Sequence, residues 1–255
     1  MVIDGKNIAE EVYATLRASR PLTLGIVVGT SNPVTDSFVR IKEKAAARLN
    51  VTLIRSELPE GATTEEGIAA VAVLAGKTDG IIVQLPLPAD IDTDAVLAAI
   101  PPGKDVDGIS KTPIVRPPVA EAVGEILSRA DIDPHGMRAA VIGSGRLVGA
   151  PTAALLTDLG AEVRVITHGD SLSPLLETDI IVSGAGEPGL IKLEHIKEGV
   201  ILIDAGTSES GGKVAGDADP ACAEKASVFT PVPGGVGPIA VAMIFKNLFV
   251  LAARD

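Results

Sequence analysis

The sequence has few residues of several types, and each scarcity excludes a class of function. A single cysteine, Cys222, rules out an internal disulfide and a metal site built from several cysteines. We interpret Cys222 as a small helix residue rather than a reactive thiol. The aromatic residues are four Phe and one Tyr, with no Trp, which argues against a stacking platform for single-stranded nucleic acid.

Positive charge and long apolar runs are also scarce. The 22 Lys and Arg residues face 33 Asp and Glu residues, and the resulting net charge of −11 excludes nucleic acid and anionic membranes as partners. No stretch reaches the roughly 20 uninterrupted apolar residues of a membrane helix. The opening residues MVIDGKNIAEEV lack the basic and apolar regions of a signal peptide, so we expect a cytoplasmic protein.

What the chain does contain is an alternation of strand-like and helix-like runs. Of its 255 residues 46% are hydrophobic, enough for a sizeable core. In the first half, strands are expected at 22–28, 51–58 and 79–87, and helices at 36–49, 64–76 (capped by Thr64) and 92–100. This order predicts a parallel sheet covered by helices.

The pattern restarts in the second half. Strands are expected at 137–145, 161–167, 179–186 and 200–206, with a helix at 148–159 and a closing helix near 240–252. The joint near 110–136 contains a helix-like run, VAEAVGEILSRA. The fold class predicted is α/β, with two α/β domains of which the second is a Rossmann-like parallel sheet.

A lysine lies on the apolar face predicted for the helix at 36–49. Phe38, Lys42, Ala45, Ala46 and Leu49 recur at helical spacing, so Lys42 is expected to point inward while Lys44 stays in water. The spacing alone favours a lysine whose stem is buried and whose ammonium reaches solvent. The alternative is an ammonium enclosed for chemistry.

A glycine turn follows the first strand of the second half. Gly143, Gly145 and Gly149 form G-x-G-x-x-x-G between a strand and a helix, where backbone N–H groups could approach a pyrophosphate. The match alone is weak. Small residues after the next three strands (THGD, SGAG, DAGT) leave room for a ligand at the same edge. Asp170 favours NAD and Arg146 favours NADP, unless both are solvated loop charges.

Three loops contain further residues that could take part in catalysis or ligand binding. VQLPLP (83–88) places Gln84 at a strand end, and IPPGKDVDG (100–108) holds Asp105 and Asp107, of which Asp105 is expected to cap or turn the backbone. TPVPGGVGP (230–238) offers a rigid wall poor in side chains, against which a flat ligand could lie. No metal site is expected.

Six segments together resemble one family. FVRIKEKA, DGIIVQLPLP, PPGKDVDG, VIGSGRLVGAP, GDADP and TPVPGGVGP occur in the order typical of the bifunctional methylenetetrahydrofolate dehydrogenase/methenyltetrahydrofolate cyclohydrolase family. The resemblance runs from about Ile8 to the C-terminal helix. KDVDG and TPVPGGVGP are its most specific motifs.

The resemblance implies a domain organisation and a reaction. It implies a folate-binding catalytic domain (1–115 with a C-terminal helix at about 236–255), a dinucleotide-binding Rossmann domain (116–235), a cleft between them, and usually a homodimer. The implied enzyme oxidises 5,10-methylenetetrahydrofolate with NADP, or alternatively NAD, and hydrolyses the methenyl product to 10-formyltetrahydrofolate. The expected partners are therefore tetrahydrofolate derivatives and a nicotinamide dinucleotide.

It also implies site residues. Lys42, Gln84 and Asp107 match the catalytic lysine, the glutamine that orients it and the pterin-binding aspartate. The expected substrate contacts are Phe38, Pro233, Gly234 and Gly235. The expected cofactor contacts are Gly143, Ser144, Gly145, Arg146, His168 and Thr207.

The sequence also departs from the family pattern. Phe38 replaces the usual tyrosine, so its hydroxyl is missing and the hydrolytic step is affected most. The turn reads Gly143-Ser144-Gly145 where the family has G-R-S, His168-Gly169 replaces His-Ser, and PPVA (117–120) replaces P-C-T-P after a shortened segment.

Other functions remain to be weighed against this one. A non-catalytic or dehydrogenase-only homologue would fit Phe38 and the altered turn, but it has little reason to keep Lys42, Gln84 and Asp107 together. An unrelated hydroxy-acid or amino-acid dehydrogenase would need a histidine or arginine in its cleft, whereas His135 and His195 are interpreted as surface residues.

Overall fold

The computed structural model describes residues 1–30, 33–210 and 213–254. The chain divides into two compact units. The lysine unit, named for Lys42, comprises Glu11–Pro118 and Val241–Asp255, and the glycine-turn unit comprises Met1–Glu10 and Val119–Ala240. Helices α1 (Gly5–Thr15) and α7 (Val236–Ala252) each contribute residues to both units. The helix α1 has no counterpart among the sequence predictions.

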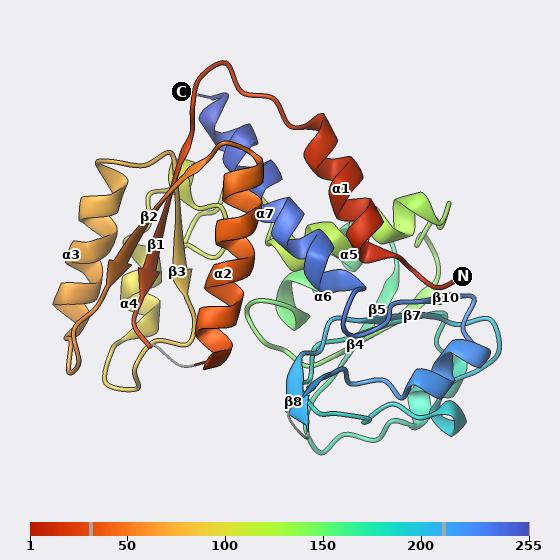
Figure 1. The fold of residues 1–255 in the computed structure, drawn as a ribbon. Coiled ribbons are helices and arrows are strands. Elements are labelled where there is room, and N and C mark those ends of the chain that lie inside the picture. The colour runs from red at the N-terminus through yellow and green to blue at the C-terminus, as the bar shows by residue number, and fades with distance from the viewer. Residues whose placement is uncertain (31–32, 211–212, 255) are drawn as a thin grey trace. The chain divides into compact units, whose positions relative to one another are not determined.

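The lysine unit is built on a three-stranded parallel sheet in the order β2-β1-β3 (Figure 1). Its strands are β1 (Thr23–Val28), β2 (Thr52–Glu57) and β3 (Gly80–Gln84). Its other helices are α2 (Pro33–Arg48), α3 (Thr64–Ala75), α4 (Thr93–Ala98) and the 3-10 helix η1 (Pro102–Lys104). The predicted alternation is therefore confirmed for this half of the chain.

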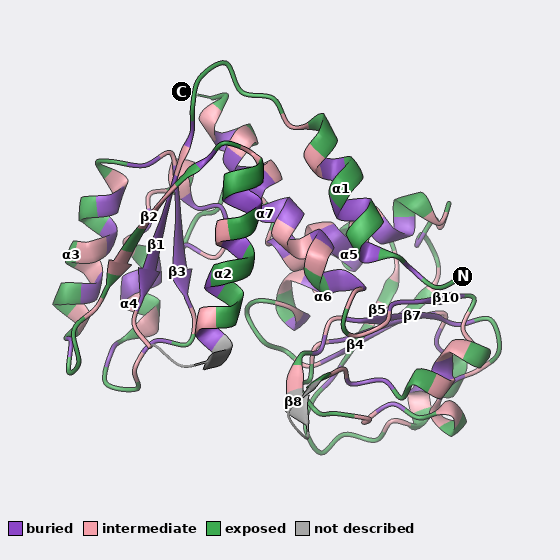
Figure 2. Ribbon diagram, in the orientation of Figure 1, coloured by how far each residue is buried: buried purple, intermediate pink, exposed green. Residues whose placement is uncertain are grey.

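Helices cover both faces of this sheet. Alternate residues of β1 (Leu24, Ile26 and Val28) pack in one cluster with residues of α2 and α7, whereas Val27 packs in a second cluster with residues of α3 and α4. Figure 2 shows β1 and β3 buried along their length. The strands are continuous apolar runs for this reason, because neither face meets water.

Two details of the helices differ from the sequence predictions. The N-cap of α3 is Thr63 rather than Thr64, in a capping box in which Thr63 Oγ1 accepts from Glu66 N–H and the Glu66 carboxylate accepts from Thr63 N–H. On α2 the buried face runs through Val39, Lys42 and Ala46, and Phe38 is 40% exposed. The predicted face was wrong at Phe38 because the compact Val39, one position on, faces the sheet.

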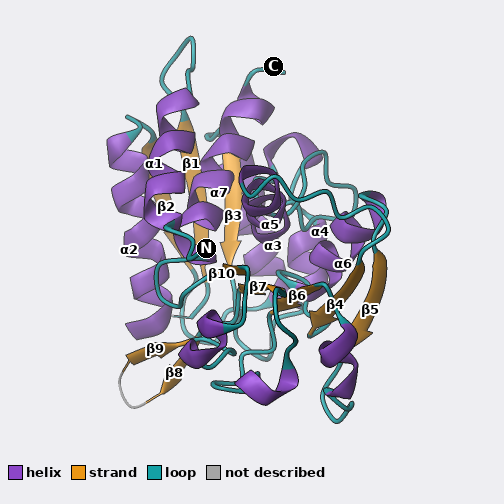
Figure 3. Ribbon diagram, turned by 90° about the vertical axis from the view of Figure 1, so that its right-hand side faces the viewer, coloured by secondary structure: helices purple, strands orange, loops and turns teal. Residues whose placement is uncertain are grey.

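The glycine-turn unit contains a five-stranded parallel sheet in the order β10-β7-β6-β4-β5, seen in Figure 3. The strands are β4 (Arg138–Ile142), β5 (Glu162–Ile166), β6 (Ile180–Ser183), β7 (Ile201–Asp204) and β10 (Val228–Phe229). The helices are α5 (Pro118–Arg129) and α6 (Gly149–Asp158), with 3-10 helices η2 (Ser173–Glu177), η3 (Leu193–His195) and η4 (Pro220–Glu224). A hairpin of β8 (Ser208–Ser210) and β9 (Lys213–Ala215) was not anticipated.

The order of these strands reverses beside β4, since β5 lies on one side of it and β6 on the other. That reversal is the switch point at which open parallel sheets bind ligands, beyond the carboxyl ends of the strands. The Rossmann-like sheet predicted for the second half is confirmed. Among the described residues, no helix is long and apolar enough to cross a membrane.

Candidate active site

Lys42 and Gln84 meet in the interior of the lysine unit. Lys42 projects from the sheet-facing side of α2, and Gln84 is the last residue of β3. Lys42 Nζ lies 2.8 Å from Gln84 Oε1, and the two residues are only 9% and 8% exposed. Gln84 Nε2 donates to the carbonyl of Leu85 at 2.9 Å, which turns the amide oxygen toward the amine. The inward orientation predicted for Lys42 is therefore confirmed.

The protonation of Lys42 is coupled to Asp107. Burial lowers the pKa of Lys42 from its usual value of 10.5, and the nearby Asp107 carboxylate opposes this effect. Burial raises the pKa of Asp107 to about 6; Lys42 opposes the increase and Asp105 adds to it. For both groups the loss of water outweighs their mutual attraction. Burial thus favours the neutral form of each group and shifts the two pKa values toward neutrality, the direction that acid–base chemistry requires.

Asp107 lies on a loop fixed by buried side chains. Asp105 is fully buried, and its Oδ2 accepts the N–H of Ser110 at 2.7 Å, so the structural role predicted for Asp105 is confirmed. Asn247 of α7 donates through Nδ2 to the carbonyls of Val106 (2.9 Å) and Arg116 (3.0 Å). Sequence reasoning missed Asn247, although a polar residue within an apolar helix was a signal for it.

The glycine turn joins β4 to α6 in the glycine-turn unit. Gly143 has φ +95°, and a Cβ there would lie 2.8 Å from the carbonyl oxygen of Gly184. A Cβ on Gly149 would lie 2.0 Å from the carbonyl oxygen of Gly143, so this glycine lets the helix approach the turn. A Cβ on Gly145 would meet nothing within 4 Å. Two glycines thus build the turn, and the third leaves its outer surface open, as a bound pyrophosphate requires.

The other cofactor candidates also lie on loops after strands of this sheet. Ser144 and Arg146 in the turn, His168 after β5 and Thr207 after β7 are all exposed. Asp170 accepts the N–H of Thr167 at 2.7 Å and its hydroxyl at 2.8 Å through one carboxylate oxygen. These bonds lower the pKa of Asp170 and engage it in its own turn, which favours the structural interpretation of this residue.

The candidate substrate residues are divided between the two units. Phe38 lies on α2, one helical turn before Lys42, and the residue is 40% exposed. Pro233, Gly234 and Gly235 belong to the glycine-turn unit. There the carbonyl of Gly234 accepts the N–H of Gly5 at 2.9 Å, and a Cβ on Gly5 would lie 1.8 Å from the Gly235 carbonyl oxygen.

The cysteine and the two histidines set aside by the sequence analysis differ in their surroundings. Cys222 is fully buried on η4, and burial raises the pKa of its thiol to about 11, so the thiolate is disfavoured. His195 Nδ1 accepts the N–H of Lys192 at 3.1 Å and is half-buried, whereas His135 is exposed. Within the described ranges, no group of three His, Cys, Asp or Glu residues could hold a metal ion.

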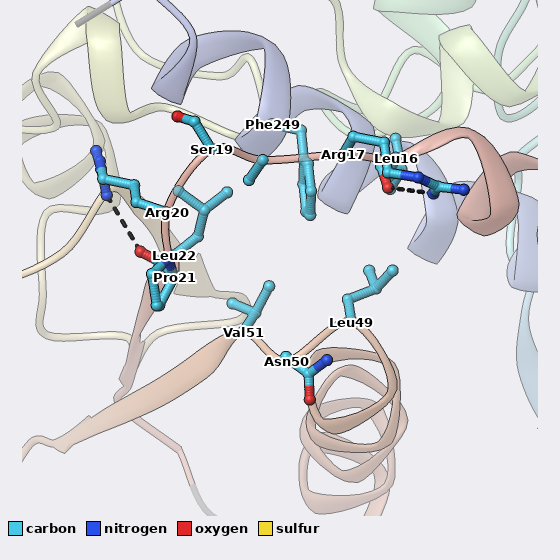
Figure 4. Close-up of a pocket in the computed structure, with 11 residues that line it drawn as sticks. Leu16, Arg17, Ser19, Arg20, Pro21, Leu22, Leu49, Asn50, Val51 and Phe249 are labelled. Atoms are coloured by element: carbon cyan, nitrogen blue, oxygen red, sulfur yellow. Dashed lines mark hydrogen bonds between the residues drawn. The ribbon is translucent and has the colours of Figure 1, made fainter.

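A cavity of about 390 Å³ lies elsewhere in the lysine unit. Figure 4 shows Leu49 and Val51 projecting into it from the segment around Asn50, beneath the segment that contains Arg17 and Arg20. None of the candidate site residues lines this cavity.

A Rossmann-like sheet with an open glycine turn, together with a separate α/β unit that encloses a lysine, defines a dinucleotide-dependent enzyme. Comparison with known proteins identifies one family. The model of the tetrahydrofolate dehydrogenase/cyclohydrolase catalytic domain matches residues 3–107, and the model of the NAD(P)-binding domain of the same family matches residues 117–255. The chain therefore belongs to the tetrahydrofolate dehydrogenase/cyclohydrolase family and is a bifunctional NAD(P)-dependent enzyme, which confirms the resemblance.

Individual relatives in this family match this chain over nearly its whole length. The bifunctional protein FolD of Halothermothrix orenii is 38% identical over 96% of this chain and 95% of its own length. The FolD methylenetetrahydrofolate dehydrogenase/cyclohydrolase structure from Campylobacter jejuni is 31% identical, with a TM-score of 0.95 over 100% of this chain and 99% of that one. The Trypanosoma brucei enzyme, complexed with NADP and an inhibitor, is 33% identical, with a TM-score of 0.93 over 100% of this chain and 97% of that one.

Proposed function

We propose that Lys42, Gln84 and Asp107 carry the folate chemistry of this enzyme. In this proposal the chain oxidises 5,10-methylenetetrahydrofolate to the methenyl compound and hydrolyses that compound to 10-formyltetrahydrofolate. The observation that carries the assignment is the buried contact of 2.8 Å between Lys42 Nζ and Gln84 Oε1, beside a carboxyl whose pKa is raised to about 6.

Lys42 manages the proton of the hydrolytic step. Water attacks the methenyl carbon, and the amine of Lys42 takes the proton that the water loses. The bond from that carbon to N5 of the folate then breaks as the proton of the new hydroxyl passes to N5, which leaves the formyl group on N10. This role requires a neutral amine, and burial favours that form by lowering the pKa of Lys42.

Gln84 orients the amine without taking part in proton transfer. Its oxygen accepts one N–H of Lys42, while its own NH₂ is held by the carbonyl of Leu85. An amide fixed in this way keeps Nζ in one position in both protonation states, because a neutral amine still has an N–H to donate.

Asp107 binds the pterin ring. Its carboxylate accepts hydrogen bonds from the pterin's amino and ring N–H groups, and such bonds require the ionised form. With a pKa of about 6, Asp107 is ionised at neutral pH. Phe38, Pro233, Gly234 and Gly235 remain the predicted substrate contacts.

The dinucleotide is assigned to the glycine turn and the loops beside it. Gly143, Ser144, Gly145 and Arg146 are proposed to hold the pyrophosphate and ribose, with His168 and Thr207 as further contacts. When bound, the nicotinamide ring accepts the hydride that leaves the methylene carbon. We propose NADP as the preferred cofactor, because the exposed Arg146 in the turn offers a positive charge to a 2′-phosphate. Asp170, whose ionised form is favoured by its bonds to Thr167, favours NAD instead. NAD is the alternative.

One assay tests the proposed reactions. The protein is supplied with 5,10-methylenetetrahydrofolate and either NADP or NAD, and the absorbance of the methenyl compound is followed. We expect a rise and then an enzyme-dependent decay, with a lower KM for NADP. A rise without decay would assign a dehydrogenase-only enzyme, the outcome that the missing hydroxyl at Phe38 favours. Absence of both phases would contradict the proposal.

The oligomeric state and the domain limits remain predictions. We propose a homodimer, and the edge strand β5 is a surface on which two copies could pair, since Val165 is 43% exposed there. Sedimentation of the wild type and Val165→Lys tests it; a monomeric wild type would contradict it. For the domains we retain the division into 1–115 with about 236–255, and 116–235.

A further inference from the structure

The loop after β6 forms one wall of the proposed dinucleotide site. It lies at the switch point of the sheet, directly beside the glycine turn. A Cβ on Gly143 would lie 2.8 Å from the Gly184 carbonyl oxygen, and a Cβ on Gly184 would lie 2.3 Å from Val148 Cγ1. The shape of the turn therefore depends on where residues 184–187 are held.

A single buried carboxylate holds that loop. Asp217 is 0% exposed and accepts two hydrogen bonds from the loop and a third from Ser183, the last residue of β6. Its Oδ2 accepts from Ser183 Oγ at 2.6 Å and from Ala185 N–H at 2.8 Å, and its Oδ1 accepts from Glu187 N–H at 2.8 Å. Hydrogen bonds to an ionised acceptor are the stronger kind, and both oxygens of this carboxylate are used.

The surrounding backbone is built to admit this carboxylate. A Cβ on Gly206 would lie 2.2 Å from Asp217 Cγ. A second buried carboxylate, Asp204 at the end of β7, accepts the N–H groups of Gly206 (2.9 Å) and Ala218 (2.8 Å). Together the two aspartates tie the loop after β6 and the loop after β7 to the segment after β9 that contains Asp217.

Placing two carboxylates in the interior costs free energy. Burial raises the pKa of Asp204 to about 6, and the charge of Asp217 adds to the increase. Folding alone gives little reason for the arrangement, because buried charged networks are often no more stable than apolar packing. A gain in positioning at the adjacent dinucleotide site offers such a reason.

We propose that Asp217 is a positioning residue for the dinucleotide. It fixes residues 184–187 against the glycine turn before the cofactor arrives, so that binding does not have to order this loop. The inference rests on the proposed function, in which the turn at 143–149 binds NADP or NAD.

The decisive variant is Asp217→Asn. Asparagine has the same shape, but its amide replaces one accepting oxygen by an NH₂ group that can only donate. That NH₂ would face a donor of residues 183–187, and the hydrogen bond made there by the carboxylate would be lost. The backbone of this segment keeps its own anchors, since the carbonyls of Gly216 and Asp217 accept the N–H groups of Gly189 and Ile191. We expect the Kd of NADP by calorimetry, and its KM in the dehydrogenase reaction, to rise about tenfold or more.

The second activity provides an internal readout. Hydrolysis of added methenyl compound needs no dinucleotide, so its kcat and KM should match the wild type in Asp217→Asn. A variant with the wild-type Kd and KM for NADP would overturn the inference. Equal losses in NADP binding and in hydrolysis would also overturn it, because they would indicate general damage to the fold.

A milder pair of variants decides the question if Asp217→Asn does not fold. Ser183→Ala removes one donor to Asp217, and we expect the Kd of NADP to rise severalfold. The matched control is Ser227→Ala, which removes a hydrogen bond to the carbonyl of Gly199 near the amino ends of β7 and β10, where no effect on NADP is expected. Equal Kd values for both variants would overturn the inference.

The outcomes also separate this inference from the proposed function. If the wild type binds neither NADP nor NAD, the assignment of the glycine turn is wrong and the role of Asp217 falls with it. If the wild type binds NADP and the variants bind equally well, only the role of Asp217 is wrong.

Discussion

Replacing Lys42 by methionine should remove the hydrolytic activity and leave the protein folded. Methionine keeps the length and the apolar stem of lysine but has no amine. Lys42 is only 9% exposed, and burial already disfavours its charged form, so the apolar replacement should cost little stability. A positioned general base contributes about 10²–10⁴-fold to a rate. We therefore expect kcat for hydrolysis to fall by about that factor.

The assay supplies the methenyl compound directly and follows the decay of its absorbance, with the rate in buffer alone subtracted. Lys44→Met is the matched control, because it removes an exposed amine from the same helix and should leave the rate unchanged. Calorimetry with NADP should give the wild-type Kd for both variants. Hydrolysis by Lys42→Met at the wild-type rate would refute the assignment of Lys42.

The same variant has a second consequence, at Asp107. The charge of Lys42 lowers the pKa of Asp107, which burial raises to about 6. Without Lys42 this pKa should rise further, so the loss of folate binding at acid pH should begin at a higher pH than in the wild type. Fluorescence or calorimetric titration with a folate ligand across pH 5 to 8 measures this directly. An unchanged pH dependence would mean that the two side chains are not coupled.

Further predictions follow from neighbouring positions. Asp107→Asn should raise the folate KM of both activities. The folded pKa of Asp107 is about 6 against the usual 3.8, so its ionisation destabilises the fold by up to roughly 3 kcal/mol. Urea unfolding should therefore show the stability difference between variant and wild type moving in favour of the variant as pH rises from 4 to 7, and staying constant below pH 4. Phe38→Tyr should raise kcat for hydrolysis and leave NADP binding unchanged; a fall in kcat would contradict the role given to the missing hydroxyl. Gly149→Ala should destabilise the protein by about 1–3 kcal/mol, because its Cβ would lie 2.0 Å from the carbonyl oxygen of Gly143. Gly145→Ala should keep wild-type stability, because its Cβ would meet nothing within 4 Å, and should weaken NADP binding alone.

Local patterns in the sequence were sufficient for most of the fold. Apolar runs bounded by glycine and proline predicted the strands of the two parallel sheets except the two-residue β10. The clearest were β1, β3, β6 and β7, because strands buried on both faces have no polar alternation to obscure them. The sequence was a weaker guide to which face of α2 is buried. Phe38 and Val39 are both apolar, and only packing against the sheet decides which of them is buried.

The candidate site could be predicted in part for the same reason. The helical spacing of α2 indicated that Lys42 points inward, but its contact with Gln84 joins positions 42 residues apart and was suggested only by the family resemblance. The hydrogen bonds of Asp217 to the loop after β6 span 30 to 34 residues, and GDADP carries no local signal of them. Such contacts are set by the strand order, which the sequence of one chain does not display.

The protonation of Lys42 is the central claim, and nuclear magnetic resonance of isotopically labelled lysine side chains tests it most directly. The resonance that disappears in Lys42→Met identifies Lys42, and its chemical shift is followed as pH is varied. We predict that Lys42 titrates clearly below the usual lysine pKa of 10.5. Titration of Lys42 at that usual value would contradict the claim that burial prepares this amine for proton transfer.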